Sequence, residues 1–170
     1  MSIFVSLELI SVSPKSLKNS TLNSEENLRE LFDMEDDEEI TKLEISKWEK
    51  RRELYPDLPP GPGCSDLEDQ AEDEGVSLSA IRYTFHVPVS CGSGEAPNLE
   101  RILEASEDMD GVRVVMSYLY HDLDDAGIVG FVDIANGSVE DEESMQFDSE
   151  PEEFFKLSRN WLGWEFPESP

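Results

Sequence analysis

The sequence predicts an α+β fold, a mostly antiparallel sheet of about four or five strands with about four helices packed on it. The first observation is a hairpin, because two runs rich in Val, Ile, Tyr and Phe, 112–120 and 128–135, flank a polar turn at 121–127. The second is the alternation of apolar and polar residues near the start of the chain and again over 79–90. The third is the helical spacing of apolar residues, which is clearest over 24–34.

The hairpin within 111–138 is the centre of the predicted core. Alternation divides the side chains of its first strand between two faces, Val112, Val114, Met116, Tyr118 and Tyr120 on one and Arg113, Val115, Ser117 and Leu119 on the other. Both sets are largely apolar, so we expect both faces of this part of the sheet to be covered.

Three further strands are expected. Ile3, Val5, Leu7 and Leu9 predict a strand over about 2–11, which Pro14 ends. A strand over about 79–90 carries Ile81, Tyr83, Phe85, Val87 and Val89 on one face, and its Pro88 indicates a sheet edge or a bulge. The turn pair Asn136–Gly137 favours a last strand over 138–147, in which the acids at 140–143 are a candidate interruption.

Helices are expected between and after these strands. Ser24 is a suitable N-cap, and Glu25 and Glu26 follow it in the first turn of the helix over 24–34. A second helix is predicted from Asp36–Glu39 to Pro56. Its apolar arc consists of Ile40, Leu43, Trp48, Leu54 and Tyr55, and its other face carries Lys42, Lys47, Lys50 and Arg52.

Two more helices complete the prediction. One follows Pro97 and carries Leu99, Ile102 and Leu103. The other begins at the capping box formed by Ser149 and Glu152. Its apolar residues are Phe154, Phe155, Leu157, Trp161 and Leu162, and Trp164 and Phe166 follow them. We expect these aromatic side chains to lie in the core or over a sheet edge, with binding anchors as the alternative.

The length of 170 residues suits one domain spanning 1–170. The clearest change of composition is at 56–76, which is rich in Pro, Gly and acidic residues and is predicted to be a loop or linker. Its alternative role is an acidic arm that becomes ordered against a basic partner.

Charge is the most unusual property of the chain. There are 40 acidic and 13 basic residues, and the net charge is −27. Such a surface repels nucleic acid and anionic membranes and attracts basic proteins and divalent cations. The N-terminal run lacks a leading positive charge and contains Glu8, so no secretory signal is expected, and Cys64 and Cys91 are too few for a disulfide scaffold. We therefore expect a cytoplasmic protein.

Signals for chemistry are weak. Cys91, in a Gly-containing loop before a helix, could act as a nucleophile only with His121 brought close in the fold, because His86 points to the other side of its strand. Asp122, Asp124, Gly127 and Asp133 match an EF-hand loop in part, but the flanks predict strands and position 12 lacks the usual Glu. We expect no enzyme, no cofactor and no specific metal site, and weak association with cations at most.

The function is therefore inferred from charge. Small size, cytosolic character, strong acidity and the lack of a catalytic set are shared with many immunity proteins that neutralise bacterial toxins, a resemblance of type that no motif carries. We expect an inhibitor that captures a basic protein, most concretely a nuclease-type toxin. The residues expected to bind it are Asp122, Asp124, Asp125, Glu140, Asp141, Glu142 and Glu143.

An enzyme is one alternative to this function, and a deep pocket that collects Cys91, carboxylates and His86 or His121 would support it. Two further alternatives remain. One is nucleic-acid mimicry, in which carboxylates imitate phosphates and block a DNA- or RNA-binding protein. It requires one continuous acidic track, whereas the acids of this sequence fall into separate patches at 25–39, 66–74 and 140–153. The other is an acidic surface that serves solubility alone.

Overall fold

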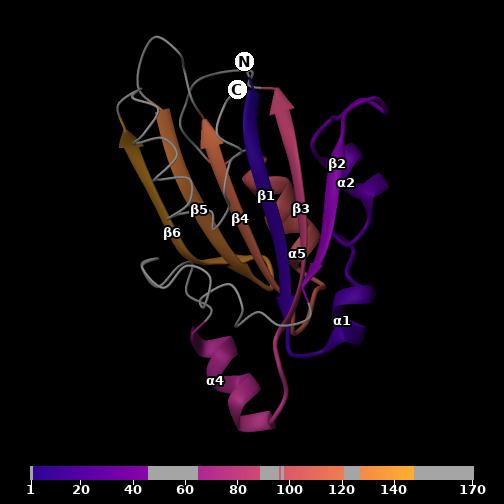
Figure 1. The fold of residues 1–170 in the computed structure, drawn as a ribbon, viewed down its shortest axis with the longest axis vertical. Helices are drawn as coiled ribbons and strands as arrows, with labels where there is room; N and C mark the ends of the chain where they lie inside the picture. Colours follow the sequence, from indigo (N-terminus) through magenta and orange to yellow (C-terminus); the bar gives the residue numbers. More distant parts are fainter. Residues whose placement is uncertain (1, 46–64, 89–95, 97, 121–126, 148–170) are drawn as a thin grey trace.

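The computed structural model describes residues 2–45, 65–88, 96, 98–120 and 127–147. It confirms the α+β class, with a six-stranded antiparallel sheet that has more strands than the sequence predicts, and 4 helices in this described part (Figure 1). The strand order is β2-β3-β1-β4-β5-β6. The strands are β1 (Ser2–Ser11), β2 (Ile40–Ile45), β3 (Ser79–Pro88), β4 (Arg113–Tyr120), β5 (Gly127–Ala135) and β6 (Ser138–Phe147). The helices are α1 (Pro14–Lys18), α2 (Glu25–Leu31), α4 (Ser65–Glu74) and α5 (Leu99–Ser106).

The two faces of the sheet are covered by different elements. On one, the main face, Leu7 of β1 belongs to a large buried cluster with Leu17 of α1, Leu28 of α2 and Ile102 of α5. The opposite face has a smaller cluster. Its members are Ile10, Leu67, Ala71, Leu78, Ala80 and Val115, of which Leu67 and Ala71 belong to α4. Val114 and Val115 of β4 point to different faces of the sheet, and both are buried. This agrees with the prediction that both faces of this strand are covered.

The prediction of a helix from Asp36–Glu39 onward is wrong over 40–45, which forms β2. Ile40 and Leu43 are three residues apart, which suits one face of a helix, whereas in a strand they point to different faces, and Leu43 is 51% exposed. Pairing decides it, because Ile40–Ile45 hydrogen-bonds to β3 in antiparallel register, with Lys42 opposite Tyr83. The rest of that predicted helix, 46–55, lies outside the described residues.

The prediction of a loop over 56–76 is wrong for its second half. Residues 65–74 form α4, whose Leu67 and Ala71 are buried one turn apart against the opposite face of the sheet. The prolines of the segment all precede this helix, and Gly75 at φ 67 ends it. Composition averaged over the whole segment hid this short amphipathic stretch; residues 56–64 lie outside the described part.

Pro88 does not mark an edge strand, since β3 lies between β2 and β1. β2 pairs only with residues 80–85 of β3, so Pro88 lies beyond the end of β2. Of the described strands, only β1 pairs with Pro88. The acids at 140–143 do not interrupt β6, which continues to Phe147 with one register shift opposite Asp133 and Ile134. The predicted helix after Ser149 lies outside the described residues.

Two buried ion pairs bridge neighbouring strands on the opposite face. Arg82 of β3 donates to Glu8 of β1 at 3.0 Å, and Arg113 of β4 donates to Asp133 of β5 at 2.6 and 3.1 Å. The carboxylates are almost completely buried, with side-chain exposures of 3% for Glu8 and 1% for Asp133. Charges at such depth require close partners, so each pair favours one register between its two strands.

The turn between β5 and β6 is held against the end of α5. Asn136 and Gly137 both have positive φ, 49° and 78°, as a two-residue hairpin turn requires. The Gly137 amide donates to the Ser106 hydroxyl at 3.1 Å, and that hydroxyl donates to the Leu103 carbonyl at 3.0 Å. A Cβ at Gly137 would lie 2.6 Å from Cγ of Glu107 and 3.1 Å from the Leu103 carbonyl oxygen.

Gly137→Ala should therefore lower the free energy of unfolding more than Gly75→Ala. Both glycines have positive φ, but a Cβ at Gly75 meets nothing within 4 Å. We expect about 1–2 kcal/mol for Gly75→Ala, from the backbone alone, and about 2–4 kcal/mol for Gly137→Ala, from backbone and crowding together. Urea unfolding of both variants measures the difference, and equal losses would contradict the contact between the turn and α5.

Asp133→Ala should be strongly destabilising, by about 3–5 kcal/mol, because it removes the buried carboxylate that pairs with Arg113. The control is Glu44→Ala, which removes the carboxylate of a surface pair with Lys42 at 3.7 Å. That substitution should cost less than about 1 kcal/mol. Chemical denaturation compares the two, and a small effect of Asp133→Ala would show that the pair does not stabilise the sheet.

Candidate functional site

The residues predicted to bind a partner fall into two groups. Asp122, Asp124 and Asp125 lie outside the described residues. The run 140–143 lies on β6, the last strand of the sheet. Glu140, Asp141 and Glu142 are exposed, whereas the side chain of Glu143 is outside the described part.

The strand divides these carboxylates between both faces of the sheet. Register partners in neighbouring strands share a sheet face. Asp141 is the register partner of Asp133, so both side chains lie on the opposite face, the one covered by α4. Glu142 is the register partner of Val132, so its side chain lies on the main face. Glu140 has no Cα partner in the register and is the extra residue of a β-bulge. The three side chains therefore surround the strand rather than form one flat patch; we call them the β6 acidic edge.

The first half of β6 is exposed on both sides. All five consecutive residues from Ser138 to Glu142 are exposed, whereas Phe131–Ile134 of the neighbouring β5 are all buried. Burial on both sheet faces therefore stops between these two strands. β6 is nevertheless continuous over its length, because it pairs with β5 from Ser138 to Phe147.

Glu142 acts on a buried tyrosine of the main face. Burial raises the pKa of the Tyr118 hydroxyl above its usual value, and the nearby negative charge of Glu142 raises the pKa further. Both causes favour the neutral phenol, the first by removing water and the second by repelling a phenolate.

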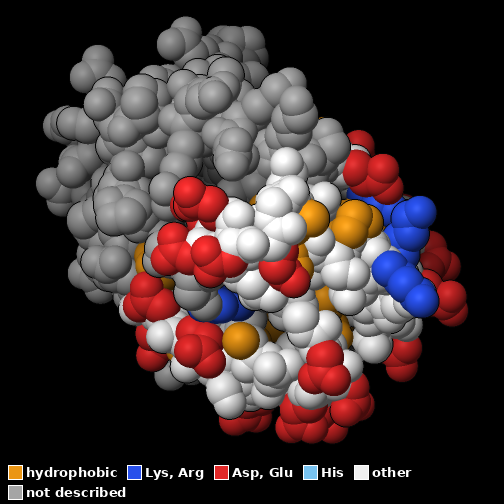
Figure 2. Space-filling view, turned by 90° about the horizontal axis from the view of Figure 1, so that it is seen from below, with side chains coloured by type: hydrophobic (Ala, Val, Ile, Leu, Met, Phe, Trp, Pro, Cys, Tyr) orange, Lys and Arg blue, Asp and Glu red, His pale blue; other side chains and the backbone are white. Residues whose placement is uncertain are grey.

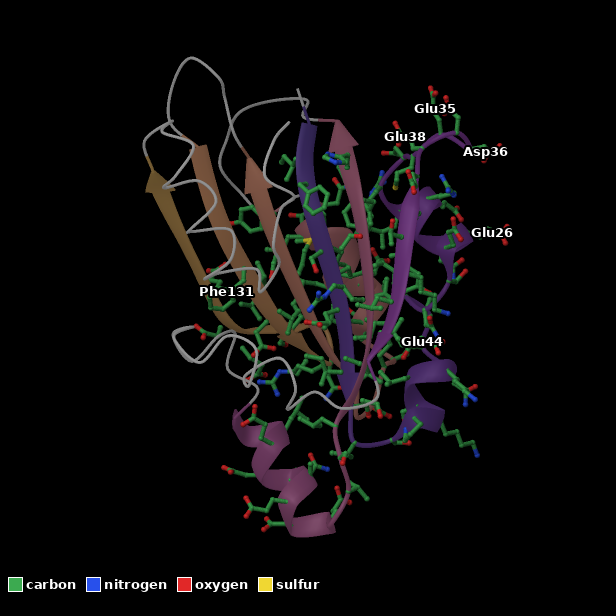
Figure 3. The ribbon with its side chains drawn as sticks, viewed as in Figure 1. Glu26, Glu35, Asp36, Glu38, Glu44 and Phe131 are labelled. Carbon is green, nitrogen blue, oxygen red and sulfur yellow. The ribbon has the colours of Figure 1, made fainter. Side chains whose placement is uncertain are left out.

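A second acidic surface, which the sequence analysis noted as a patch but did not select as a site, lies on α2 and the turn after it. A hollow of about 790 Å³ is lined by Met34, Arg29 and five carboxylates. These are Glu25, Glu26, Glu30, Asp33 and Asp36, which we call the α2 acidic surface. Glu26, Glu35 and Asp36 are exposed and point outward from the sheet (Figure 3).

Arg29 organises this surface. Its guanidinium donates to a Glu25 carboxylate oxygen at 3.0 Å and to the Glu35 carbonyl at 2.8 Å, and so joins the first turn of α2 to the turn after the helix. Asp33 lies between them at φ 54, and the Met34 amide donates to the Arg29 carbonyl at 2.8 Å. Arg29 thus pairs with the Glu25 carboxylate and binds the backbone of the turn that carries Glu35 and Asp36.

A second hollow, of about 470 Å³, lies between α2 and α5 and shares Glu30 and Asp33 with the first. Arg101 of α5 donates to the Leu31 carbonyl at 3.0 Å and to Asp33 at 3.2 Å. A sequence signal for the α2 acidic surface exists, because Glu26 and Glu30 are four residues apart and therefore share one face of the helix.

Packing against β3 fixes α2 near one side of the sheet. Phe32 contacts Phe85 with ring centroids 4.9 Å apart, and the Tyr83 hydroxyl donates to Asn23 at 2.6 Å. The β6 acidic edge is at the other side, and five strand spacings of about 4.8 Å separate the two edge strands by about 24 Å. Figure 2 shows carboxylates in several separate groups on the lower face, with uncharged surface between them.

The weaker chemical candidates are not assembled in the described part. Cys91 and His121 lie outside it, and His86 lies beside Phe4 with ring centroids 4.6 Å apart, where burial lowers its pKa. Asp133, the twelfth position of the EF-hand-like pattern, is paired with Arg113 instead. In the residues that the structure describes, no group of three or more His, Cys, Asp and Glu side chains could hold a metal ion.

Comparison with known proteins gives no relatives to argue from. No protein-family model, curated protein or solved structure matches the chain. Among the described helices, none is long and apolar enough to cross a membrane. The described part of the chain is thus an acidic α+β protein.

Glu142→Gln should lower the pKa of Tyr118 without returning it to 10.0, because burial is the larger cause of the shift. The folded protein holds this phenolic proton more tightly than the unfolded chain does. The resulting stability is therefore present below about pH 10 and is lost as the pH rises through the higher folded-state pKa. The loss takes place between the unfolded-state and the folded-state pKa of Tyr118. Because Glu142→Gln lowers the folded-state pKa, it should narrow this pH range.

The measurement is an ultraviolet titration of tyrosinate. The titration curve of Tyr118→Phe is subtracted from each curve, so that the difference reports Tyr118 alone. Glu44→Gln is the control, since Glu44 acts on Tyr83 and not on Tyr118. If the Tyr118 titration is the same in Glu142→Gln and in the unsubstituted protein, the placement of Glu142 on the main face is wrong.

Proposed function

We propose that this chain is a non-enzymatic cytoplasmic inhibitor that captures and blocks a basic protein, most concretely as an immunity protein against a nuclease-type toxin. The observation that carries the proposal is the α2 acidic surface, five carboxylates that line one hollow on α2 and the turn after it. A basic patch is the natural complement of such a surface, and the net charge of −27 acts in the same direction.

Electrostatics supports capture in two ways. The long-range field of the chain speeds encounter with a basic partner, by a factor of about 10–10³ where the field is focused. At contact, the carboxylates pair with Lys and Arg side chains and fix the orientation of the partner. Nuclease-type toxins suit this role because a protein that binds phosphates presents Lys and Arg on its surface.

Apolar contact has to supply the rest of the binding free energy. Val139, 38% exposed, lies next to the β6 acidic edge. An exposed valine beside carboxylates is a suitable contact for the alkyl stem of a lysine or arginine. Met34 lines the hollow beside the α2 acidic surface but is only 8% exposed, so it offers a partner little apolar area.

Nucleic-acid mimicry has less support. It requires carboxylates in a track with the spacing of phosphates. The α2 acidic surface and the β6 acidic edge lie toward opposite sides of the sheet, and the lower face shows separate groups (Figure 2). Separate patches suit a partner with separate basic contacts better than a groove shaped for a duplex.

Removing charge from either acidic surface should slow association with the basic partner recovered by affinity capture from the native host. The two test variants are Glu26→Gln/Glu30→Gln/Asp36→Asn and Glu140→Gln/Asp141→Asn/Glu142→Gln. The control, Asp69→Asn/Glu72→Gln/Asp73→Asn on α4, removes the same charge. We expect at least one test variant to associate about tenfold more slowly than the control at low salt.

Salt should remove that difference, because the screening length falls from about 30 Å at 0.01 M to about 8 Å at 0.15 M ionic strength. Dissociation should change much less, since it depends on buried contacts. Stopped-flow association across this range is the measurement. An association rate that is flat with salt would mean that the acidic charge serves solubility alone.

A further inference from the structure

We propose that the basic partner binds by strand addition to β6: an extended segment of the partner pairs with the outer edge of this strand, and its Lys and Arg side chains face Glu140, Asp141 and Glu142. The inference rests on the proposed function and specifies its contact. Its first basis is topology. β6 has ten residues and is the last strand of the described sheet, paired there with β5 alone.

The backbone of such a strand is a template. An edge strand presents N–H and C=O groups on its outer side, and an extended peptide can satisfy them as an added strand. The bulge at Glu140 increases the local twist, so regular pairing would begin at Asp141 and run toward Phe147.

Length and charge, rather than exposure, favour β6 over the other edge, because residues 41–44 of β2 are exposed as well. In β6, Asp141 and Glu142, where regular pairing would begin, are both exposed, so an approaching strand meets little covering on either face at that point. β2 has six residues, and it carries Lys42 close to Glu44 and an exposed Leu43. The β6 edge alone combines length with a uniform negative charge.

The negative charge of β6 determines which kind of strand can pair with its outer edge. A second copy of this chain is disfavoured, because antiparallel pairing of β6 with itself around Asp141 would place like charges opposite one another. Asp141 and Glu142 lie on different faces of the sheet. A matching strand therefore has basic side chains at successive positions, with one on each face, rather than only at alternate positions.

The experiment uses the full chain, labelled with ¹⁵N, and a capped peptide probe with the sequence Val-Thr-Lys-Lys-Lys-Lys-Thr-Val. A matched probe carries N-methyl groups on alternate backbone nitrogens, so that it keeps its charge but loses the donors needed for pairing. We expect the first probe to bind about tenfold or more tightly than the second, because several backbone hydrogen bonds are lost. We also expect hydrogen exchange to slow at amides of β6.

Variants test the same contact from the protein side. Glu140→Gln/Asp141→Asn/Glu142→Gln should weaken peptide binding about tenfold, whereas Asp69→Asn/Glu72→Gln/Asp73→Asn on α4 should leave it within about twofold. Equal binding of the two probes, or unchanged exchange at β6, would overturn strand addition.

The inference and the proposed function can fail separately. If the full chain captures a basic protein but β6 amides are unaffected in that complex, strand addition is wrong and capture stands. If the peptide adds to β6 but no basic protein is captured, the edge is a strand-addition site and the inhibitor function is wrong.

Discussion

Everything in this fold depends on the pairing of β1 on both of its sides. β1 lies between β3 and β4, with Glu8 opposite Arg82 on one side and Val115 on the other. This register decides which residues form the main face and which form the opposite face, since a shift of one residue would exchange them. The buried pairs Glu8–Arg82 and Arg113–Asp133 resist such a shift, because a displaced charge would lie in the interior without its partner.

The same register explains where the acidic surfaces lie. Apolar side chains take the inner strands on both faces, so the carboxylates of a chain with net charge −27 are displaced to α2, to α4 and to the last strand. The two acidic residues that are buried in the described part, Glu8 and Asp133, are each paired with an arginine. The two surfaces proposed to bind a partner are therefore the places where the sheet and its first helices end.

Much of the fold could be predicted because its signals are local. Alternation located β1, β3, β4 and β5, and the Asn136–Gly137 pair located the turn before β6. β2 was missed because the spacing of Ile40 and Leu43 favours a helix, and only the pairing with β3 makes this segment a strand. α4 was missed because Leu67 and Ala71 are few among acids, and their burial depends on Ile10 and Val115 far away in sequence. For the site, the acidic run on β6 could be located, and strand alternation divides Asp141 and Glu142 between the two faces, but the bulge at Glu140 could not be predicted. The α2 acidic surface was not selected because it depends on the contact of Arg29 with the Glu35 carbonyl in the next turn.

The central place of β1 has a consequence for how the chain is made. Ser2–Ser11 leaves the ribosome well before both of its neighbours in the sheet, 79–88 and 113–120. At about 5–20 residues per second, this apolar segment waits for several seconds before its first sheet partner exists. Pairings so distant in sequence also close slowly. The acids between β1 and β3 then have a role before folding, because mutual repulsion between nascent chains keeps the waiting strand from pairing with another copy of itself.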